Sequence, residues 1–280
     1  MASIRDHLTE IYVFVDDWMK KHPHRSHWRT SPNRHPDFTD AETITIALMQ
    51  GALGVDTLKQ TYKLVRDNDR EAFAHLPCYK QWVRRLHALT SLVGQIAQAA
   101  AFHVFSRYSA RLFVLDSKPL PVCKPLRHGR VNLLREEGAY FGKSSAGWFF
   151  GFKLHSLIHQ PTGVIISSIL MPGNLNDRDA ALALCLSVDG GLVLADWGYS
   201  GPDTFEALYE HADMVRIMPA DTGERRHLVS SLRQRIETTF SDLWRRFVDR
   251  LFSRSWNGLW NTVKLKICYH NMKLAGLISA

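Results

Sequence analysis

The spacing of apolar residues divides the chain near residue 107. Before this point apolar side chains recur at helical intervals, and Thr39 with Glu42 has the spacing of a capping box that starts a helix. The helical segments cover residues 4–20, 40–53, 57–65, 79–89 and 92–105. We therefore predict an all-helical domain over residues 1–107.

After residue 108 the pattern changes to short runs of apolar and β-branched residues. These runs predict strands at residues 111–115, 148–158, 164–171, 192–195 and 214–218. Helical patterns are found at residues 176–186, 202–211 and 225–247. The order is strand, strand, strand, helix, strand, helix, strand, helix, which is typical of an α/β, ribonuclease H-like mixed sheet with the first strand central and the fourth beside it. We predict such a catalytic domain over residues 108–280, with a C-terminal helix at its end.

Two of the predicted strands are followed directly by an acid. Asp116 follows the first strand and Asp196 the fourth, so the fold would bring the two carboxylates together, and Glu237 on the closing helix can face them. Divalent cations such as Mg²⁺ prefer oxygen ligands, and a pair of such ions promotes displacement at phosphorus. Each acid also has an ordinary explanation: a turn residue, a cap before Trp197, or a helix acid paired with Arg233. Their joint placement favours a metal site.

Composition and charge narrow the class of protein. The chain has 280 residues, 45% of them hydrophobic, which is enough for one large domain or two modest ones with a real core. A net charge of +8 favours a polyanionic partner, most commonly nucleic acid, although solubility or a membrane surface also explains it. The four cysteines form no C-x-x-C pair, and no apolar run is long enough to span a membrane. We expect a soluble cytoplasmic protein with free thiols.

Basic residues near the predicted acids and on the helix over residues 79–89 are candidates for DNA contact. They are Lys80, Arg84, Arg85, Arg127, Arg130, Lys143, Arg233, Arg235, Arg245 and Arg246. The alternative is a set of ordinary solvated faces, with Trp82 and Leu86 in the core and Arg84 and Arg85 in water. A proline-rich basic loop over residues 21–38 carries four histidines, three of them clustered at positions 22, 24 and 27, and we interpret it as a solvated loop in preference to a metal site.

Five motifs in order resemble those of the DDE transposases of bacterial insertion sequences, with insertion-sequence family 982 as the closest likeness. The motifs are Asp116-Ser117-x-Pro119-Leu120-Pro121-Val122-Cys123, Gly151-Phe152-Lys153-Leu154-His155, Pro172-Gly173, Asp196-Trp197-Gly198-Tyr199 and Arg233-x-x-x-Glu237-x-x-Phe240. The likeness extends from about Thr39 to Leu265. The chain departs from related families at Asn176, where a His often precedes the Asp, and at Ser230 and Trp244, where a Tyr and a Lys are common.

The resemblance implies that Asp116, Asp196 and Glu237 are the catalytic, metal-binding residues, with two ions of Mg²⁺ or Mn²⁺ as cofactor. It also implies that the helical domain helps bind the terminal inverted repeats. We expect an Mg-dependent DNA transposase that cuts the ends of the element and joins them to target DNA. Its partners would be transposon ends and target DNA, with no membrane and with a homodimer assembled on DNA in the bacterial nucleoid. The alternatives are a metal-dependent nuclease of the same fold and a domesticated, non-catalytic DNA-binding protein.

Overall fold

In a computed structural model the chain folds into two compact units. The structure describes residues 4–23, 36–129, 133–145, 147–199, 201–217, 224–247 and 253–279. A helical unit contains Met1–Ala101, Leu243–Ser253 and Asn257–Ala280, and a sheet unit contains Phe102–Asp242 and Arg254–Trp256. The sequence division assigned residues 257–280 to the catalytic domain, whereas the structure groups them with the helical unit.

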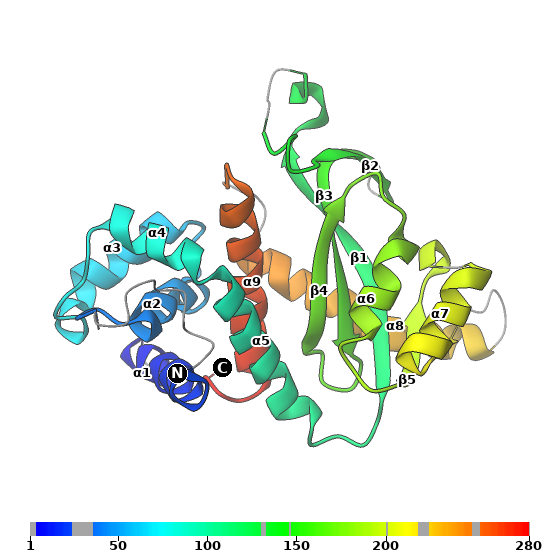
Figure 1. Ribbon diagram of the computed structural model, residues 1–280, viewed down its shortest axis with the longest axis horizontal. Helices are drawn as coiled ribbons and strands as arrows, with labels where there is room; N and C mark the ends of the chain where they lie inside the picture. The colour runs from blue at the N-terminus through cyan, green and yellow to red at the C-terminus, as the bar shows by residue number, and fades with distance from the viewer. Residues whose placement is uncertain are drawn as a thin grey trace. The chain divides into compact units, whose positions relative to one another are not determined.

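The predicted N-terminal helices are confirmed, each within a few residues of its expected ends (Figure 1). They are α1 (Ile4–Lys21), α2 (Asp40–Leu53), α3 (Leu58–Asn68), α4 (Tyr79–Ala88) and α5 (Thr90–Phe105), with a short 3₁₀ turn, η2 (Arg70–Ala72), after α3. Most of the proline-rich basic loop, residues 24–35, lies outside the described residues. No single described helix has the length and apolarity to cross a membrane, and α4 with α5 reaches that composition only as a pair bent by 64°.

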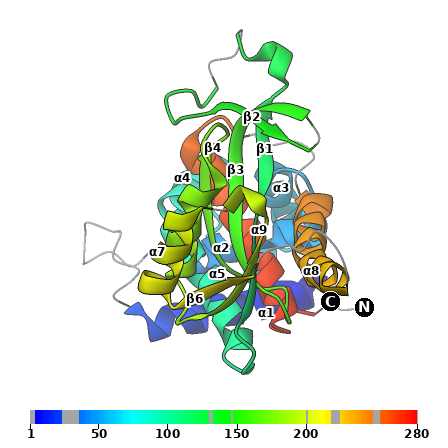
Figure 2. The same cartoon turned by 90° about the vertical axis from the view of Figure 1, so that its right-hand side faces the viewer.

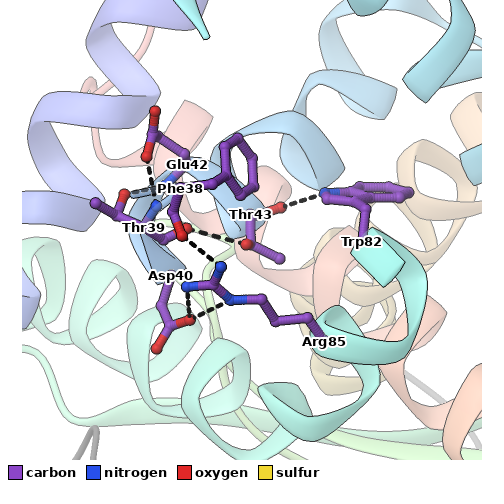
Figure 3. A network of polar contacts seen from close by, with 7 residues as sticks. All are labelled: Phe38, Thr39, Asp40, Glu42, Thr43, Trp82 and Arg85. Carbon is purple, nitrogen blue, oxygen red and sulfur yellow. Dashed lines mark hydrogen bonds and ion pairs between the residues drawn. The ribbon is translucent and has the colours of Figure 1, made fainter. Parts of the chain in front are cut away.

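The start of α2 is held by the predicted capping box and by two side chains of α4 (Figure 3). The Glu42 N–H donates to Oγ1 of Thr39 at 3.1 Å, and the Thr39 N–H donates to Oε2 of Glu42 at 2.5 Å. From α4, the Arg85 Nε donates to Oδ1 of Asp40 at 2.6 Å, and the Trp82 indole donates to the Thr43 carbonyl at 3.2 Å. The Arg85 and Trp82 bonds fix α4 against α2, and the capping box satisfies the N–H groups of Thr39 and Glu42 at the start of the helix.

The C-terminal helix α9 (Trp256–Leu274) packs within the helical unit over nearly all its length. The Asn271 side chain donates to the Ala97 carbonyl of α5 at 2.9 Å. The Tyr269 ring lies so close to Gly51 of α2 that a Cβ there would be 2.4 Å from the ring. Beyond α9, the Ser279 N–H donates to Oε2 of Glu10 in α1 at 2.8 Å, so segments near both ends of the chain complete the same core.

The sheet unit has the ribonuclease H-like mixed sheet that the sequence predicted (Figure 2). Its described strands are β1 (Leu112–Cys123), β2 (Tyr140–Ser144), β3 (Gly147–His159), β4 (Ile165–Pro172), β5 (Gly191–Ala195) and β6 (Met214–Ile217). The order is β2-β3-β1-β5-β6, with β4 paired to β3. The β1–β3 and β3–β4 pairs are antiparallel, and the β1–β5 and β5–β6 pairs are parallel. β1 is therefore central and β5 lies beside it, as expected.

Helices cover both faces of this sheet. Figures 1 and 2 show α6 (Ala181–Cys185) and α7 (Pro202–Ala212) on one face and α8 (Glu224–Phe247) on the other. The expected helix after Asn176 begins as a 3₁₀ turn, η4 (Asp177–Ala180), and the Asn176 side chain makes no capping bond there. A second short turn, η5 (Trp197–Tyr199), follows β5.

The prediction that the first strand ends at Asp116 is wrong. β1 continues to Cys123 and pairs with β3 through Pro119 and Pro121. Among the described residues, β5 pairs with β1 only as far as Leu115, so one edge of the strand is unpaired beyond that point. A strand tolerates proline at such an edge, because the missing N–H leaves no hydrogen bond unmade. The short strand β2 was not predicted, since residues 140–144 show no clear alternation.

Candidate functional site

Asp116 and Asp196 lie side by side, as the sequence predicted. In the parallel β1–β5 pair, Leu115 is in register with Ala195, and each strand has its aspartate as the next residue. Burial raises the pKa of Asp116 to about 6, and the Asp196 charge adds to that rise. Two neighbouring carboxylates repel each other, so a positive charge near them is favourable.

Two hydrogen-bond donors partly offset the negative charge of Asp116. The Ser117 N–H donates to Oδ1 at 2.8 Å, and Nη2 of Arg233 donates to Oδ2 at 3.3 Å. Both interactions lower the pKa of Asp116 without cancelling the effect of burial. Arg233 is contributed by α8, on the face of the sheet opposite α6 and α7. The candidate DNA-binding residue Arg233 is thus an ion-pair partner of Asp116 in this arrangement.

Asp196 is held by the turn that follows β5. Its Oδ1 accepts the Gly198 N–H at 2.9 Å. A Cβ on Gly198 would lie 3.1 Å from Oδ1 of Asp196 and 3.1 Å from Oδ2 of Asp177. A larger residue at position 198 would therefore press on two carboxylates at once.

Glu237 does not join the two aspartates in this arrangement. It is exposed on α8, one turn after Arg233 and on the same side of the helix. Within the described part of the chain, no three His, Cys, Asp or Glu side chains converge closely enough to hold a metal ion. The structure thus brings together two of the three predicted catalytic acids.

A second group of side chains lies beside the two aspartates. Lys153 of β3 lies 2.6 Å from Oδ1 of Asp177, and the Ser117 hydroxyl donates to Oδ2 of Asp177 at 3.4 Å. The Tyr199 hydroxyl lies 2.8 Å from Nδ1 of His155, and both rings are fully buried. Burial raises the pKa of Tyr199 well above its usual value and lowers that of His155 to about 4, so both stay neutral at pH 7.

Signals for this second group were present in the sequence but weak. Lys153, His155 and Tyr199 lie within motifs, yet the motifs by themselves assign no role in the site to His155 or Tyr199. Asp177 enters the sequence analysis only as the Asp that follows Asn176. The pairs join positions 24 and 44 residues apart, so local spacing gives no hint of them.

The other candidate DNA-binding residues have different environments. Lys80, Arg84, Arg127 and Lys143 are exposed. Arg235 donates to the carbonyls of Gln160 and Pro161 at 3.1 and 3.2 Å, and Arg85 is largely buried in its ion pair with Asp40. Arg130 lies outside the described residues, as do the side chains of Arg245 and Arg246 at the end of α8.

The donors at the Asp116–Asp196 pair suit a hard divalent cation. Both side chains offer carboxylate oxygens, which Mg²⁺ and Mn²⁺ prefer, and such an ion would relieve the repulsion that helps raise the pKa of Asp116. Cysteine and neutral imidazole, which favour softer metals, are not among the groups in contact with Asp116 in the described structure. The site therefore fits the kind of metal that phosphoryl transfer requires.

Comparison with known proteins gives one match to a family model and one to a solved structure. The model described as "Transposase DDE domain" matches residues 107–272. The cryo-EM structure of a piggyBac transposase synaptic complex with hairpin DNA is similar over 95% of this chain and 73% of that chain, at 10% sequence identity and a TM-score of 0.45. No curated protein matches.

Proposed function

Because the chain belongs to the family of transposases with a DDE domain, we propose that it cuts the ends of an insertion sequence and joins them to target DNA. Members of this family are generally polynucleotidyl transferases. The observation that supports this proposal best is the register of β1 with β5, which sets Asp116 beside Asp196. The two residues are 80 positions apart in the sequence, and the pairing of β1 with β5 brings them to neighbouring positions at the strand ends.

We assign Asp116, Asp196 and Glu237 as the acids that hold Mg²⁺ or Mn²⁺. When bound, a pair of these ions supplies the positive charge that activates the attacking oxygen and stabilises the leaving one. Asp116 and Asp196 provide a fixed pair of oxygen ligands on the sheet. In this assignment α8 must shift before Glu237 can approach the aspartates, since α8 presents Arg233 to Asp116 in the described structure.

The proposed reaction has two displacements at phosphorus. Water first attacks the phosphodiester at each end of the element and leaves a 3′-hydroxyl. That hydroxyl then attacks a phosphate of the target strand, so one phosphodiester bond forms as another breaks. No side chain forms a covalent intermediate, which agrees with a site built from carboxylates and an arginine.

The exposed basic residues of the sheet unit, such as Lys143 and Arg127, are proposed to bind the phosphates of the DNA. On the helical unit, Lys80 and Arg84 of α4 are proposed to contact the terminal inverted repeats. Assembly as a homodimer on two element ends would let one complex join both ends.

The test is strand transfer by Asp116→Asn, Asp196→Asn and Glu237→Gln on DNA that carries the inverted repeats, with Mg²⁺ or Mn²⁺. We expect each change to reduce strand transfer by about a hundredfold or more, because each removes a ligand charge and keeps the side-chain size. Glu206→Gln, which alters an exposed acid of α7, is the matched control and should retain wild-type activity.

Wild-type strand transfer by any of the three variants would contradict the assignment of that acid. Products of hydrolysis without joined product, from the wild-type protein, would instead identify a nuclease. DNA binding with neither product would identify a non-catalytic DNA-binding protein.

A further inference from the structure

We propose that Lys153 and Asp177 form a charge-balancing pair that sets how strongly the Asp116–Asp196 site attracts divalent cations. This inference rests on the proposed function, because it takes Asp116 and Asp196 as metal ligands. It assigns to Lys153 and Asp177 a positioning and electrostatic role, without direct contact with the reacting atoms.

The pair is well anchored and largely shielded from water. Nζ of Lys153 lies 2.6 Å from Oδ1 of Asp177 and donates to the Leu175 carbonyl at 3.2 Å. The side chains of Lys153 and Asp177 are only 14% and 19% exposed. Charges in such surroundings act on their neighbours more strongly than charges in bulk water.

Asp177 is close to both catalytic aspartates. Its Oδ2 and Oδ1 of Asp196 each lie 3.1 Å from one point, the position of a Cβ on Gly198, so these oxygens are separated by no more than twice that distance. Ser117 connects Asp177 to Asp116, since its hydroxyl donates to Asp177 at 3.4 Å and its N–H to Asp116 at 2.8 Å. The charges of all three aspartates also raise the pKa of Tyr199.

The two basic side chains that pair with these aspartates, Arg233 and Lys153, lie on opposite faces of the sheet. Successive residues of a strand point to opposite faces, so Asp116 meets Arg233 of α8 on one face while Ser117 meets Asp177 on the other. Arg233 therefore balances Asp116, and Lys153 balances Asp177. If Lys153 were absent, the Asp177 carboxylate would add a negative charge without a basic partner beside the metal-binding pair.

The charge-balancing role predicts opposite effects for the two partners. Asp177→Asn leaves the Lys153 ammonium unpaired near the site, and this positive charge should repel a divalent cation. Lys153→Met leaves the Asp177 carboxylate unpaired, and this negative charge should attract one. A pair that served only to hold the fold together would weaken metal binding in the same direction when either partner was removed.

The experiment is calorimetric titration of the full-length protein with Mn²⁺ at neutral pH and without DNA. We expect Asp177→Asn to raise the Kd for Mn²⁺ about tenfold and Lys153→Met to lower it about tenfold. The double variant should return to within about threefold of the wild type, since the two charge changes cancel. Lys153→Arg keeps the charge and should bind Mn²⁺ as the wild type does, which covers the case in which Lys153→Met fails to fold.

Asp67→Asn is the control, because it breaks the exposed Arg66–Asp67 pair of the helical unit and should leave the Kd unchanged. Equal Kd values for Asp177→Asn and the wild type, or shifts of the same sign in both single variants, would overturn the proposal. Asp116→Asn distinguishes a failure of the metal-site assignment from a failure of the charge-balancing role alone. If it binds Mn²⁺ like the wild type, the metal site itself is wrong; if it loses binding while Asp177→Asn does not, only the charge-balancing role fails.

Discussion

Asp116 is a partly buried acid whose environment favours its neutral form, although its proposed role as a metal ligand requires the charged form. Burial is the main cause of its raised pKa, and the hydrogen bond from Ser117 and the Arg233 ion pair oppose that rise. The folded protein thus bears an electrostatic cost at neutral pH in the absence of a cation. Such a cost at a functional residue is common, because the site is shaped for its ligand and not for stability.

We therefore expect Asp116→Asn to stabilise the metal-free protein by about 1 to 2 kcal/mol at about pH 8. The folded pKa of Asp116 lies above its unfolded value, so folding favours the protonated form. The gain should be absent below about pH 4, where both states are protonated, and should grow as pH rises through about 6. Thermal unfolding in a chelator across this range measures it, with Glu206→Gln as the control; a gain that is the same at every pH would contradict the cause.

The sequence allowed Asp116 and Asp196 to be predicted because each directly follows an apolar run, and the strand order then makes them neighbours. Lys153 and Asp177 carried no comparable signal. Their pairing depends on how the turn after β4 folds back over β3, and a single lysine in a strand has many ordinary roles. The position of Glu237 relative to the aspartates depends on where α8 packs against the sheet, and the spacing of residues along the sequence does not determine that packing.

At the level of elements, the starts of α2 and α3 differ in how they are capped. Thr39 takes part in a reciprocal capping box with Glu42, whereas at α3 the Thr57 side chain accepts a single bond from the Gln60 N–H at 3.2 Å. α2 is also mostly buried, while α3 has one buried face. Loss of the cap should therefore have a larger effect on α2.

We expect Thr39→Ala to lower the local stability of α2 by about 1 to 2 kcal/mol, and Thr57→Ala to lower that of α3 by about 0.5 to 1 kcal/mol. Native-state hydrogen exchange of the amides in each helix measures the two losses separately. An equal or larger effect at Thr57 would show that the reciprocal bond to Glu42 adds nothing.

The capping box could be predicted from the sequence because its two residues are three positions apart. The full length of β1 could not be predicted in this way. Prolines at 119 and 121 are strand breakers when both edges of a strand are paired. Which edge stays unpaired is a property of the assembled sheet, since it depends on where β5 ends. The local pattern of residues therefore predicted the positions of the helices and strands well, and it predicted less well which strands pair with each other.

At the scale of the whole molecule, the excess of basic residues should make DNA binding depend on salt. If Lys143 contacts a phosphate as proposed, Lys143→Gln should reduce the slope of log K against log salt concentration by about 1. Lys20→Gln is the control, because Lys20 is paired with Asp16 on α1 and was not assigned to DNA. Filter binding or fluorescence anisotropy at several salt concentrations gives the slope, and an unchanged slope would remove Lys143 from the interface.

Glu10 and Ser279 are in contact although the helical unit is assembled from Met1–Ala101 and, after residues 102–242 of the sheet unit, from Leu243–Ser253 and Asn257–Ala280. During synthesis, residues 102–242 have all left the ribosome before residues 257–279 appear. Residues 102–242 can then fold first, while α2 and α5 must wait for α9, and α1 must wait for the segment after it that carries Ser279. A ribosome that stalls late would thus leave a folded sheet unit joined to an unfinished set of helices with their apolar faces exposed.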